Sequence, residues 1–377
     1  MNKTIKYLGL LAIAVLGIYL LIQNLTSTKP TEINKIKIGA VIPESGGKVA
    51  IFGKWMREGM ELGIEDFDND FPQYKGALKM YFEDSKFNVK DGLSAFERLR
   101  DVNNVDVFIS TMSNISKPIL VKMPTSKPIL LQDVTYPNIT EYGENVFRHF
   151  VSSETEAKLI SQFIEVDLGV KSCALIYQND ETGLGAKDVF DKSLTNKGIK
   201  YESFAISQDD IMANKSVITK VLESNPECII LFAYSTPWIT SMKTLKEIGY
   251  KNQILTNTAM YIDPWRKAIG NASENVVFTH PEIDTSNIKG KAFYDNYVSK
   301  HNEKPSLESA YGYDLINIIG NAYVLSEKNN TSFETELYQL KAFEGAFGRV
   351  LIPENRDIIT QIYISRIKNG EMLKTNK

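Results

Sequence analysis

Short apolar runs alternate along this chain with stretches in which apolar residues recur every three or four positions. The first run, Ile36–Ile42, predicts a buried strand, and the residues from about Phe52 onward predict a helix that follows it directly. Between them Pro43 ends the strand, and residues 45–47 supply turn chemistry. Strand, glycine turn and helix in this order form a rim that can face a ligand.

The same alternation continues through most of the chain. Further strands are predicted at residues 78–82, 105–109, 129–131, 173–177, 201–206, 228–232, 254–256 and 276–279. Helix-period segments separate these strands, so they are expected to pair in parallel through right-handed crossovers, and the predicted fold class is α/β.

The alternation breaks at residues 149–153 and resumes with a helix at about Glu154. This break predicts two doubly wound parallel sheets. Ligands of such sheets bind beyond the carboxyl ends of the strands, so the cleft between the two sheets is the expected site.

Length and composition agree with two domains and exclude several functions. The chain has 377 residues, 43% of them hydrophobic, and a formal net charge of -3. One core seldom grows to this size, and the charge provides no basic field for nucleic acid. The usual nucleotide, zinc and hydrolase motifs do not occur, and the three histidines are widely spaced. We therefore predict no catalytic residue, no metal and no cofactor.

The N-terminal 30 residues have the layout of an export signal. Lys3 and Lys6 precede an apolar run at residues 7–22, and a polar segment follows. The run has no clear small-x-small cleavage site and no cysteine that could take a lipid. We expect an uncleaved signal-anchor that tethers an exported protein to the membrane, with a cleaved signal peptide as the alternative.

The two cysteines leave a question open. Cys173 and Cys228 each begin an apolar, strand-like run. An exported protein can join such residues, but cysteine is also among the residues most often buried as a free thiol. Spacing alone does not decide between these alternatives.

Polar residues follow two predicted strands of the first half. Ser113 and Asn114 come after strand 105–109, close to a helix N-terminus that can hold a carboxylate; a simple helix cap is the alternative for Ser113. Asp133 and Thr135 come after strand 129–131 in the same way. Asp133 can hold an ammonium or amide group, or form an Asx turn.

The order and spacing of several motifs resemble the type I periplasmic solute-binding proteins, which are the branched-chain amino-acid and amide binding components of ABC transporters and relatives of receptor ligand-binding regions. The resemblance covers residues 36–370, and its motifs lie at residues 38–46, 52–53, 81–84, 111–114, 135–138, 177–183, 311–314 and 343–348.

The resemblance implies a domain organisation. It places residues 35–149 and about 280–345 in one lobe, and residues 150–279 and about 346–377 in the other, with hinges where the chain crosses between them. It also places Thr135 and Thr182 at ligand-contacting positions. Six aromatic candidates lie at strand-to-helix junctions, and the resemblance matches two of them, Phe52 and Tyr234, to cleft positions. The full set is Phe52, Tyr234, Trp238, Tyr261, Trp265 and Tyr311.

One residue departs from the family pattern. Amino-acid binders of this family place an acid after the fourth strand of the second lobe, where this chain has Thr258. A hydroxyl cannot neutralise a buried ammonium. Asp133 or Asp263 could substitute, or the ligand is an amide, an organic acid or an aromatic compound.

These features predict an extracytoplasmic, membrane-tethered protein that captures a small polar or amphipathic ligand by lobe closure and delivers it to an ABC permease, without covalent chemistry. The alternative is a sensory module that signals through a partner chain. The predicted ligand-binding residues are Phe52, Ser113, Asn114, Asp133, Thr135, Thr182, Tyr234 and Thr258.

Overall fold

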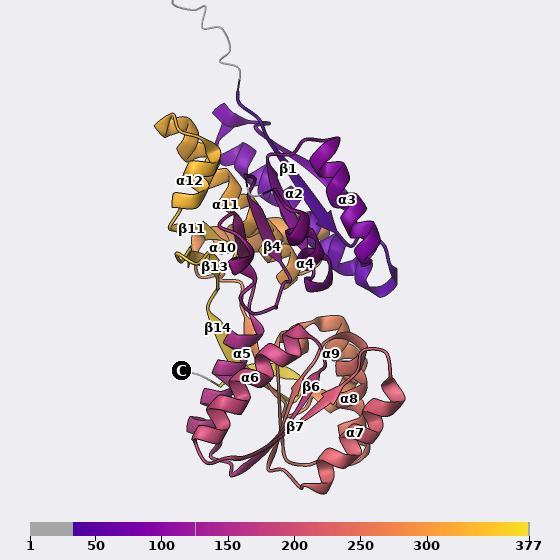
Figure 1. Cartoon of the computed structure of the whole chain (residues 1–377). Helices are drawn as coiled ribbons and strands as arrows, with labels where there is room; N and C mark the ends of the chain where they lie inside the picture. The colour runs from indigo at the N-terminus through magenta and orange to yellow at the C-terminus, as the bar shows by residue number, and fades with distance from the viewer. Residues whose placement is uncertain (1–32, 125, 376–377) are drawn as a thin grey trace, which may run out of the picture. The chain divides into compact units, whose positions relative to one another are not determined.

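Two mostly parallel sheets with helices packed against them make up the body of the protein (Figure 1). The computed structural model describes residues 33–124 and 126–375. Residues 36–377 form one unit that is separate from residues 1–35, and the description below concerns that unit alone. The predicted α/β class with two parallel-sheet lobes is confirmed.

The first sheet contains six strands, all paired in parallel. In spatial order these strands are β13 (Asp357–Ile358), β5 (Val146–His149), β4 (Ile129–Gln132), β3 (Val107–Thr111), β1 (Ile36–Ile42) and β2 (Leu78–Asp84). The helices of this lobe are α2 (Ala50–Asp70), α3 (Val89–Asp101), α4 (Ser113–Lys122), α10 (Ile288–His301), α11 (Leu307–Asn329) and α12 (Phe333–Gln339). β1 is almost entirely buried, as its apolar sequence predicts.

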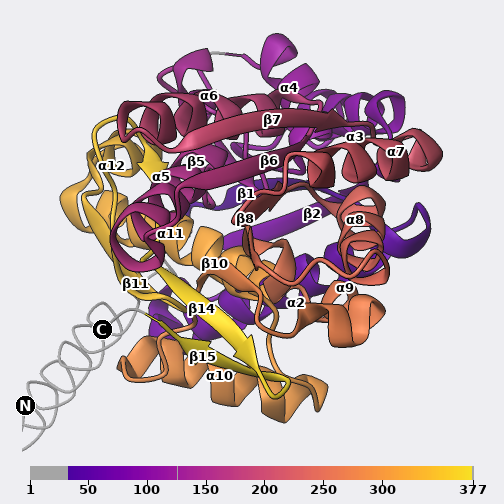
Figure 2. The same ribbon diagram turned by 90° about the horizontal axis from the view of Figure 1, so that it is seen from below.

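The second sheet contains seven strands, which are parallel except at one edge. In spatial order they are β15 (Glu371–Lys374), β14 (Ile362–Lys368), β10 (Val277–Pro281), β9 (Gln253–Thr256), β8 (Cys228–Phe232), β6 (Ser172–Gln178) and β7 (Lys200–Ile206). β14 runs antiparallel to both of its neighbours, β10 and β15, and these strands are visible in Figure 2. The helices of this lobe are α5 (Ser153–Phe163), α6 (Glu181–Asn196), α7 (Ile211–Glu223), α8 (Ser235–Glu247) and α9 (Asp263–Ile269).

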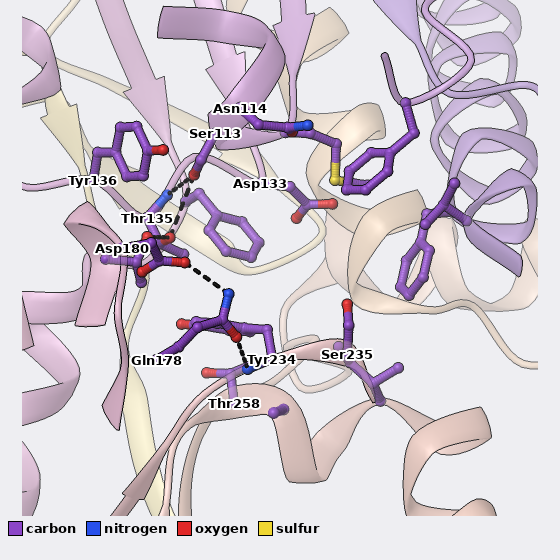
Figure 3. Close-up of a pocket in the computed structure, with 18 of the residues that line it drawn as sticks. Ser113, Asn114, Asp133, Thr135, Tyr136, Gln178, Asp180, Tyr234, Ser235 and Thr258 are labelled. Atoms are coloured by element: carbon purple, nitrogen blue, oxygen red, sulfur yellow. Dashed lines mark hydrogen bonds between the residues drawn. The ribbon is translucent and has the colours of Figure 1, made fainter. Parts of the chain in front are cut away.

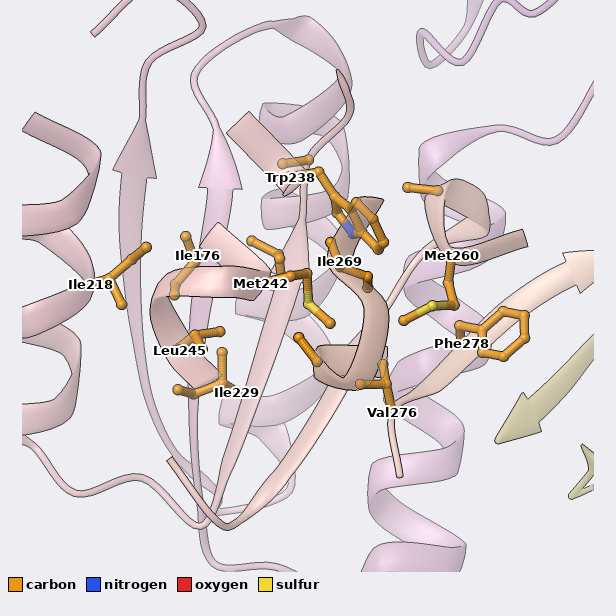
Figure 4. Packing of buried hydrophobic residues seen from close by; sticks show 14 of the residues in the cluster. Ile176, Ile218, Ile229, Trp238, Met242, Leu245, Met260, Ile269, Val276 and Phe278 are labelled. Atoms are coloured by element: carbon orange, nitrogen blue, oxygen red, sulfur yellow. The ribbon is translucent and has the colours of Figure 1, made fainter. Parts of the chain in front are cut away.

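The core of the second lobe packs α7, α8 and α9 against one face of its sheet. Trp238, Met242 and Leu245 recur at helical spacing along α8 and lie fully buried against strand residues such as Ile229 (Figure 4). Burial of apolar surface of this kind makes the largest favourable contribution to the stability of such a lobe.

The chain passes between the sheets after β5, after β10 and after β13. A short hairpin of β11 (Ala342–Gly345) and β12 (Gly348–Leu351) precedes the last of these passages. The expected assignment of residues 346–377 to the second lobe needs a correction, because β13 pairs with β5 of the first sheet and only β14 and β15 join the second. The bidentate ion pair between Arg148 and Asp357 explains why β13 stays with β5. The other lobe boundaries stay a prediction.

The cysteine pair is decided by strand register. Cys173 of β6 and Cys228 of β8 stand opposite each other on neighbouring strands, and they form a disulfide. The alternative of two free thiols is therefore wrong in this structure.

The predicted signal segment at residues 1–30, with its apolar run at residues 7–22, lies outside the described residues. Among the residues that are described, no helix has the length and apolar character needed to cross a membrane.

The closest helix contact of the first lobe depends on glycine. α2 and α11 lie against each other, and a Cβ at Gly59 of α2 would stand 1.9 Å from the backbone oxygen of Ser309 in α11. A Cβ at Gly312 of α11 would likewise stand 2.7 Å from the backbone oxygen of Met56. The two backbones thus approach more closely than any other residue type would permit.

We predict that Gly59→Ala destabilises the protein by about 1–3 kcal/mol, because the added methyl group forces the two helices apart. Helix propensity alone favours alanine by about 1 kcal/mol, so the sign of the change identifies the cause. The free energy of unfolding in urea measures it. Glu61→Ala, at an exposed position of the same helix, is the control and should change stability by less than about 0.5 kcal/mol. A stabilising Gly59→Ala would contradict the close approach.

Candidate functional site

A cavity of about 480 Å³ lies between the two sheets and is lined by residues of both (Figure 3). Its wall is formed largely by the segments that follow the carboxyl ends of β1, β3, β4, β6, β8 and β9. This is the location expected for ligands of doubly wound sheets. The structure brings every predicted site residue into this one wall: Phe52, Ser113, Asn114, Asp133, Thr135, Thr182, Tyr234 and Thr258.

A chain of hydroxyl groups crosses from the first lobe to the second. The Ser113 hydroxyl accepts a hydrogen bond from the Thr135 backbone N–H at 3.1 Å, and the Thr135 hydroxyl lies 2.8 Å from that of Thr182. Ser113 is the first residue of α4, and Met112 occupies the cap position. The cap alternative for Ser113 is therefore wrong, because its side chain holds Thr135 in place of capping the helix.

Gln178 and Asp180 of the second lobe lie in the wall, although the sequence analysis included them only in the motif at residues 177–183 and not among the ligand-binding residues. Gln178, the last residue of β6, donates to Asp180 at 2.7 Å and to Gln208 at 2.9 Å, and it accepts from the Tyr234 backbone N–H at 3.2 Å. Asp180 in turn caps α6 through the Gly183 N–H. The signal for both was their position directly at the end of a predicted strand.

A buried acid lies behind the cavity wall where Thr258 stands. Glu156 of α5 has no exposed surface and accepts hydrogen bonds from the Thr258 N–H at 2.7 Å, the Thr258 hydroxyl and the Thr279 hydroxyl. The Tyr234 hydroxyl donates to it as well, at 3.4 Å. Burial raises the pKa of Glu156, and these donors oppose the rise. Its spacing from Ala157 and Ile160 on the apolar face of the helix was a signal for burial.

The first lobe carries two acids in the cavity wall. Asp133 follows β4 with a positive φ of 54°, and its Oδ1 atom is buried with no hydrogen-bond partner among the described residues. Glu308, the second residue of α11, is only 5% exposed. Burial raises the pKa of both carboxyls, and the charge of Glu308 raises that of Asp133 further.

Aromatic rings from both lobes meet at the cavity. Phe52 of the first lobe and Trp265 of the second lie edge to face, with centroids 5.8 Å apart, and both line the wall. Three other aromatic candidates belong to the packed interior and not to the wall: Trp238 bonds Thr256, Tyr261 stacks on His280, and Tyr311 is fully buried.

The lining residues offer polar and aromatic groups that can bind a solute. Those that the structure describes include no lysine, arginine or histidine. Asp263, the other candidate acid, is not in the wall and pairs with Arg266 at 2.5 Å. Within residues 33–124 and 126–375 no group of three metal-ligating side chains occurs. The arrangement offers hydroxyl, amide and carboxylate groups on an aromatic background.

Comparison with known proteins gives a consistent result. A family model described as "Periplasmic binding protein" matches residues 35–371. The chain is 22% identical to Leu/Ile/Val-binding protein homolog 3 of Brucella melitensis, over 86% of this chain and 88% of that protein.

Solved structures show the same fold at low identity. A leucine-binding protein of Thermotoga maritima matches with a TM-score of 0.80 and 21% identity, over 90% of this chain and 98% of its own. A solute-binding protein of an ABC transporter from R. palustris, in complex with benzoate, matches with a TM-score of 0.78 and 16% identity, over 91% and 96%.

We predict that Glu156→Gln lowers the free energy of unfolding by about 1–3 kcal/mol, because an amide cannot accept from all the donors that converge on the carboxylate. The cost should shrink as pH rises. Because the pKa is raised, the contribution of Glu156 to wild-type stability is fully present below the ordinary value of 4.5 and is lost as pH rises through the folded value.

Urea unfolding between pH 4 and pH 8 measures this difference. Glu154→Gln, on the same helix and with no side-chain hydrogen bond or ion pair to another described residue, is the matched control, and it should show neither the cost nor its pH dependence. A cost for Glu156→Gln that grows with pH would show that the ionised carboxylate is the favoured form.

Proposed function

This chain belongs to the periplasmic binding protein family, and from that premise we propose that it captures a small polar or amphipathic solute between its lobes and delivers it to an ABC permease. The family acts outside the cytoplasm, so the lobes are placed on that side of the membrane. The observation that carries the proposal is the cavity between the sheets, which has predicted site residues from both lobes in its wall.

Lobe closure is supported by side chains that already meet across the cavity. The Thr135 and Thr182 hydroxyls join the lobes on one side, and the Phe52 and Trp265 rings join them on another. The exposed ion pair between Lys117 of α4 and Glu181 of α6 adds a third link. Contacts of this kind form only when two lobes approach, so they favour a closed state that excludes water from a bound solute.

The ligand is proposed to be an amino acid, an amide or an organic acid. The named relatives include Leu/Ile/Val-binding proteins and a protein crystallised with benzoate. A cavity of about 480 Å³ is within the usual range for a small ligand. Hydroxyl and amide groups fix the polar end of such a ligand, and aromatic rings enclose its body.

No covalent step is part of the proposal. The Ser113 hydroxyl faces Thr135, and His149 is buried against Asp314 at 3.1 Å, away from the cavity wall. A serine without an adjacent base is a poor nucleophile.

Membrane attachment through residues 7–22 is also proposed. The support is the charged head and apolar run of the sequence. We expect the full chain to remain in the membrane fraction after a high-salt wash and to be released by detergent, whereas a variant that lacks residues 1–30 should stay soluble. Recovery of the full chain as a shortened soluble protein would support cleavage and contradict the anchor.

We predict that at least one member of a panel of amino acids, amides, organic acids and aromatic compounds raises the melting temperature. A ligand at 100 times its dissociation constant adds about 2.7 kcal/mol to stability. Ser113→Ala should lower the affinity for that ligand about tenfold, because one buried hydrogen bond is lost. Phe52→Ala should also lower the affinity. Tyr142→Ala, at an exposed position outside the cavity, is the control.

Differential scanning fluorimetry and isothermal titration calorimetry measure these changes. Equal affinity of Phe52→Ala and Tyr142→Ala for the ligand would place the binding site elsewhere. A panel without effect would contradict the proposed function.

A further inference from the structure

All the charged side chains in the described wall of the cavity are acidic. Among its described lining residues there are four acids and no base, and the acids are Asp133, Asp180, Asp209 and Glu308. Glu156 adds a fifth carboxylate directly behind Thr258 and Tyr234. A ligand in this cavity therefore meets negative groups from both lobes.

Three of these five acids are already stabilised, two by hydrogen-bond donors of the protein and one by solvent. Asp180 accepts from the Gly183 N–H and the Gln178 amide, and Glu156 accepts from three hydroxyls and one N–H. Asp209 is exposed at the rim, where water screens its charge. Asp133 remains as the acid with an unpartnered oxygen, and the charge of Glu308, which accepts from its own backbone N–H and from the Ser306 side chain, acts on it.

The pair is held in place by the fold. The Gln132 side chain at the end of β4 donates to the Glu308 backbone oxygen at 2.8 Å, which ties the start of α11 to the residue before Asp133. Asp133 adopts a left-handed backbone conformation, uncommon for a residue other than glycine, and Figure 3 shows its carboxylate projecting into the cavity. An orphaned acceptor atom at Oδ1, in a conformation that costs energy, is a feature that a bound ligand can compensate.

We propose that the ligand carries a positively charged ammonium or amidinium group, which binds against Asp133 and Glu308 of the first lobe. The inference rests on the proposed solute-binding function and names its ligand class. It differs from the expectation that an acid after β9 holds the ammonium, because Thr258 stands there and the acid with an unpartnered oxygen, Asp133, is on the opposite lobe.

The same charges disfavour a purely anionic ligand. A carboxylate without a compensating cation would add a further negative charge to a cavity with no basic side chain, and like charges in a partly desolvated site repel strongly. The Ser113, Thr135 and Thr182 hydroxyls can still hold a carboxylate if the ligand also brings a positive charge. Rings such as Phe52 and Trp265 stabilise a cation through their faces.

The titration of the pair agrees with this assignment. Burial raises the pKa of both carboxyls, and the charge of Glu308 raises the pKa of Asp133 further, so Asp133 holds a proton more readily than an isolated exposed acid would. A ligand cation replaces that proton and provides the missing partner.

A factorial set of probes tests the charge class. L-leucine, L-leucinamide, 4-methylpentanoate and 4-methylpentanamide share one body and differ in the presence of ammonium and carboxylate, and the corresponding four compounds of phenylalanine vary the body. With the full chain at pH 7, we expect the ammonium-bearing members to bind at least about tenfold more tightly than their counterparts without it.

Two conservative variants test the residues. Asp133→Asn and Glu308→Gln keep the shape of each side chain and should remove most of the ammonium advantage while leaving the protein folded by circular dichroism. Asp263→Asn is the matched control, because it removes the same charge from an acid near the cavity that is paired with Arg266 and is not in the wall. It should keep the full advantage.

The failure of the inference differs from the failure of the proposed function. Tightest binding by a carboxylate-only or neutral member, unchanged in Asp133→Asn, overturns the cation assignment and leaves solute binding intact. The cation assignment is also overturned if none of the eight probes binds and a compound of the wider panel that has no positive charge does bind. If no compound of either set binds, both the inference and the proposed function are contradicted.

Discussion

The convergence of parallel strand ends is the constraint on which the rest of this structure depends. In each sheet every strand except the antiparallel β14 delivers its carboxyl end to the same side, so the residues that follow these strands come together. The helices that begin there add N-termini that favour polar groups. A second sheet with its own strand ends then makes a cavity in which polar residues of two lobes face one another.

That cavity requires the protein to bury polar groups, and the two lobes meet the requirement differently. In the second lobe Glu156 is surrounded by donors from Thr258, Thr279 and Tyr234, so its cost of burial is offset within the protein. In the first lobe Asp133 keeps an unpartnered oxygen beside Glu308. A network with all its hydrogen bonds made holds the cavity wall in place, whereas an acid with an unpartnered oxygen can be stabilised by a bound ligand.

The distribution of cross-lobe contacts fits this division. Hydroxyl groups meet at Thr135 and Thr182, and aromatic rings meet at Phe52 and Trp265. Each of these contacts contributes little net free energy on its own. Under the proposed function, a ligand that supplies the missing charge partner adds to them and favours the closed arrangement.

The α/β class, most strand positions and eight of the residues in the cavity wall could be predicted from the sequence, the last with the help of the family resemblance. The patterns involved are local: apolar runs mark strands, and a residue that follows a parallel strand must lie at its carboxyl end. The tertiary structure decided what depends on distant contacts. The Glu156 and Thr258 pair is separated by 102 residues, and the contact that holds Glu308 beside β4 by 176. Likewise, strand register joins Cys173 to Cys228, and backbone pairing with β5 together with the Arg148–Asp357 ion pair assigns β13 to the first sheet. A pattern along the chain records which side chains are buried or turned to the rim, but the charge balance of the cavity depends on which of them the fold brings together.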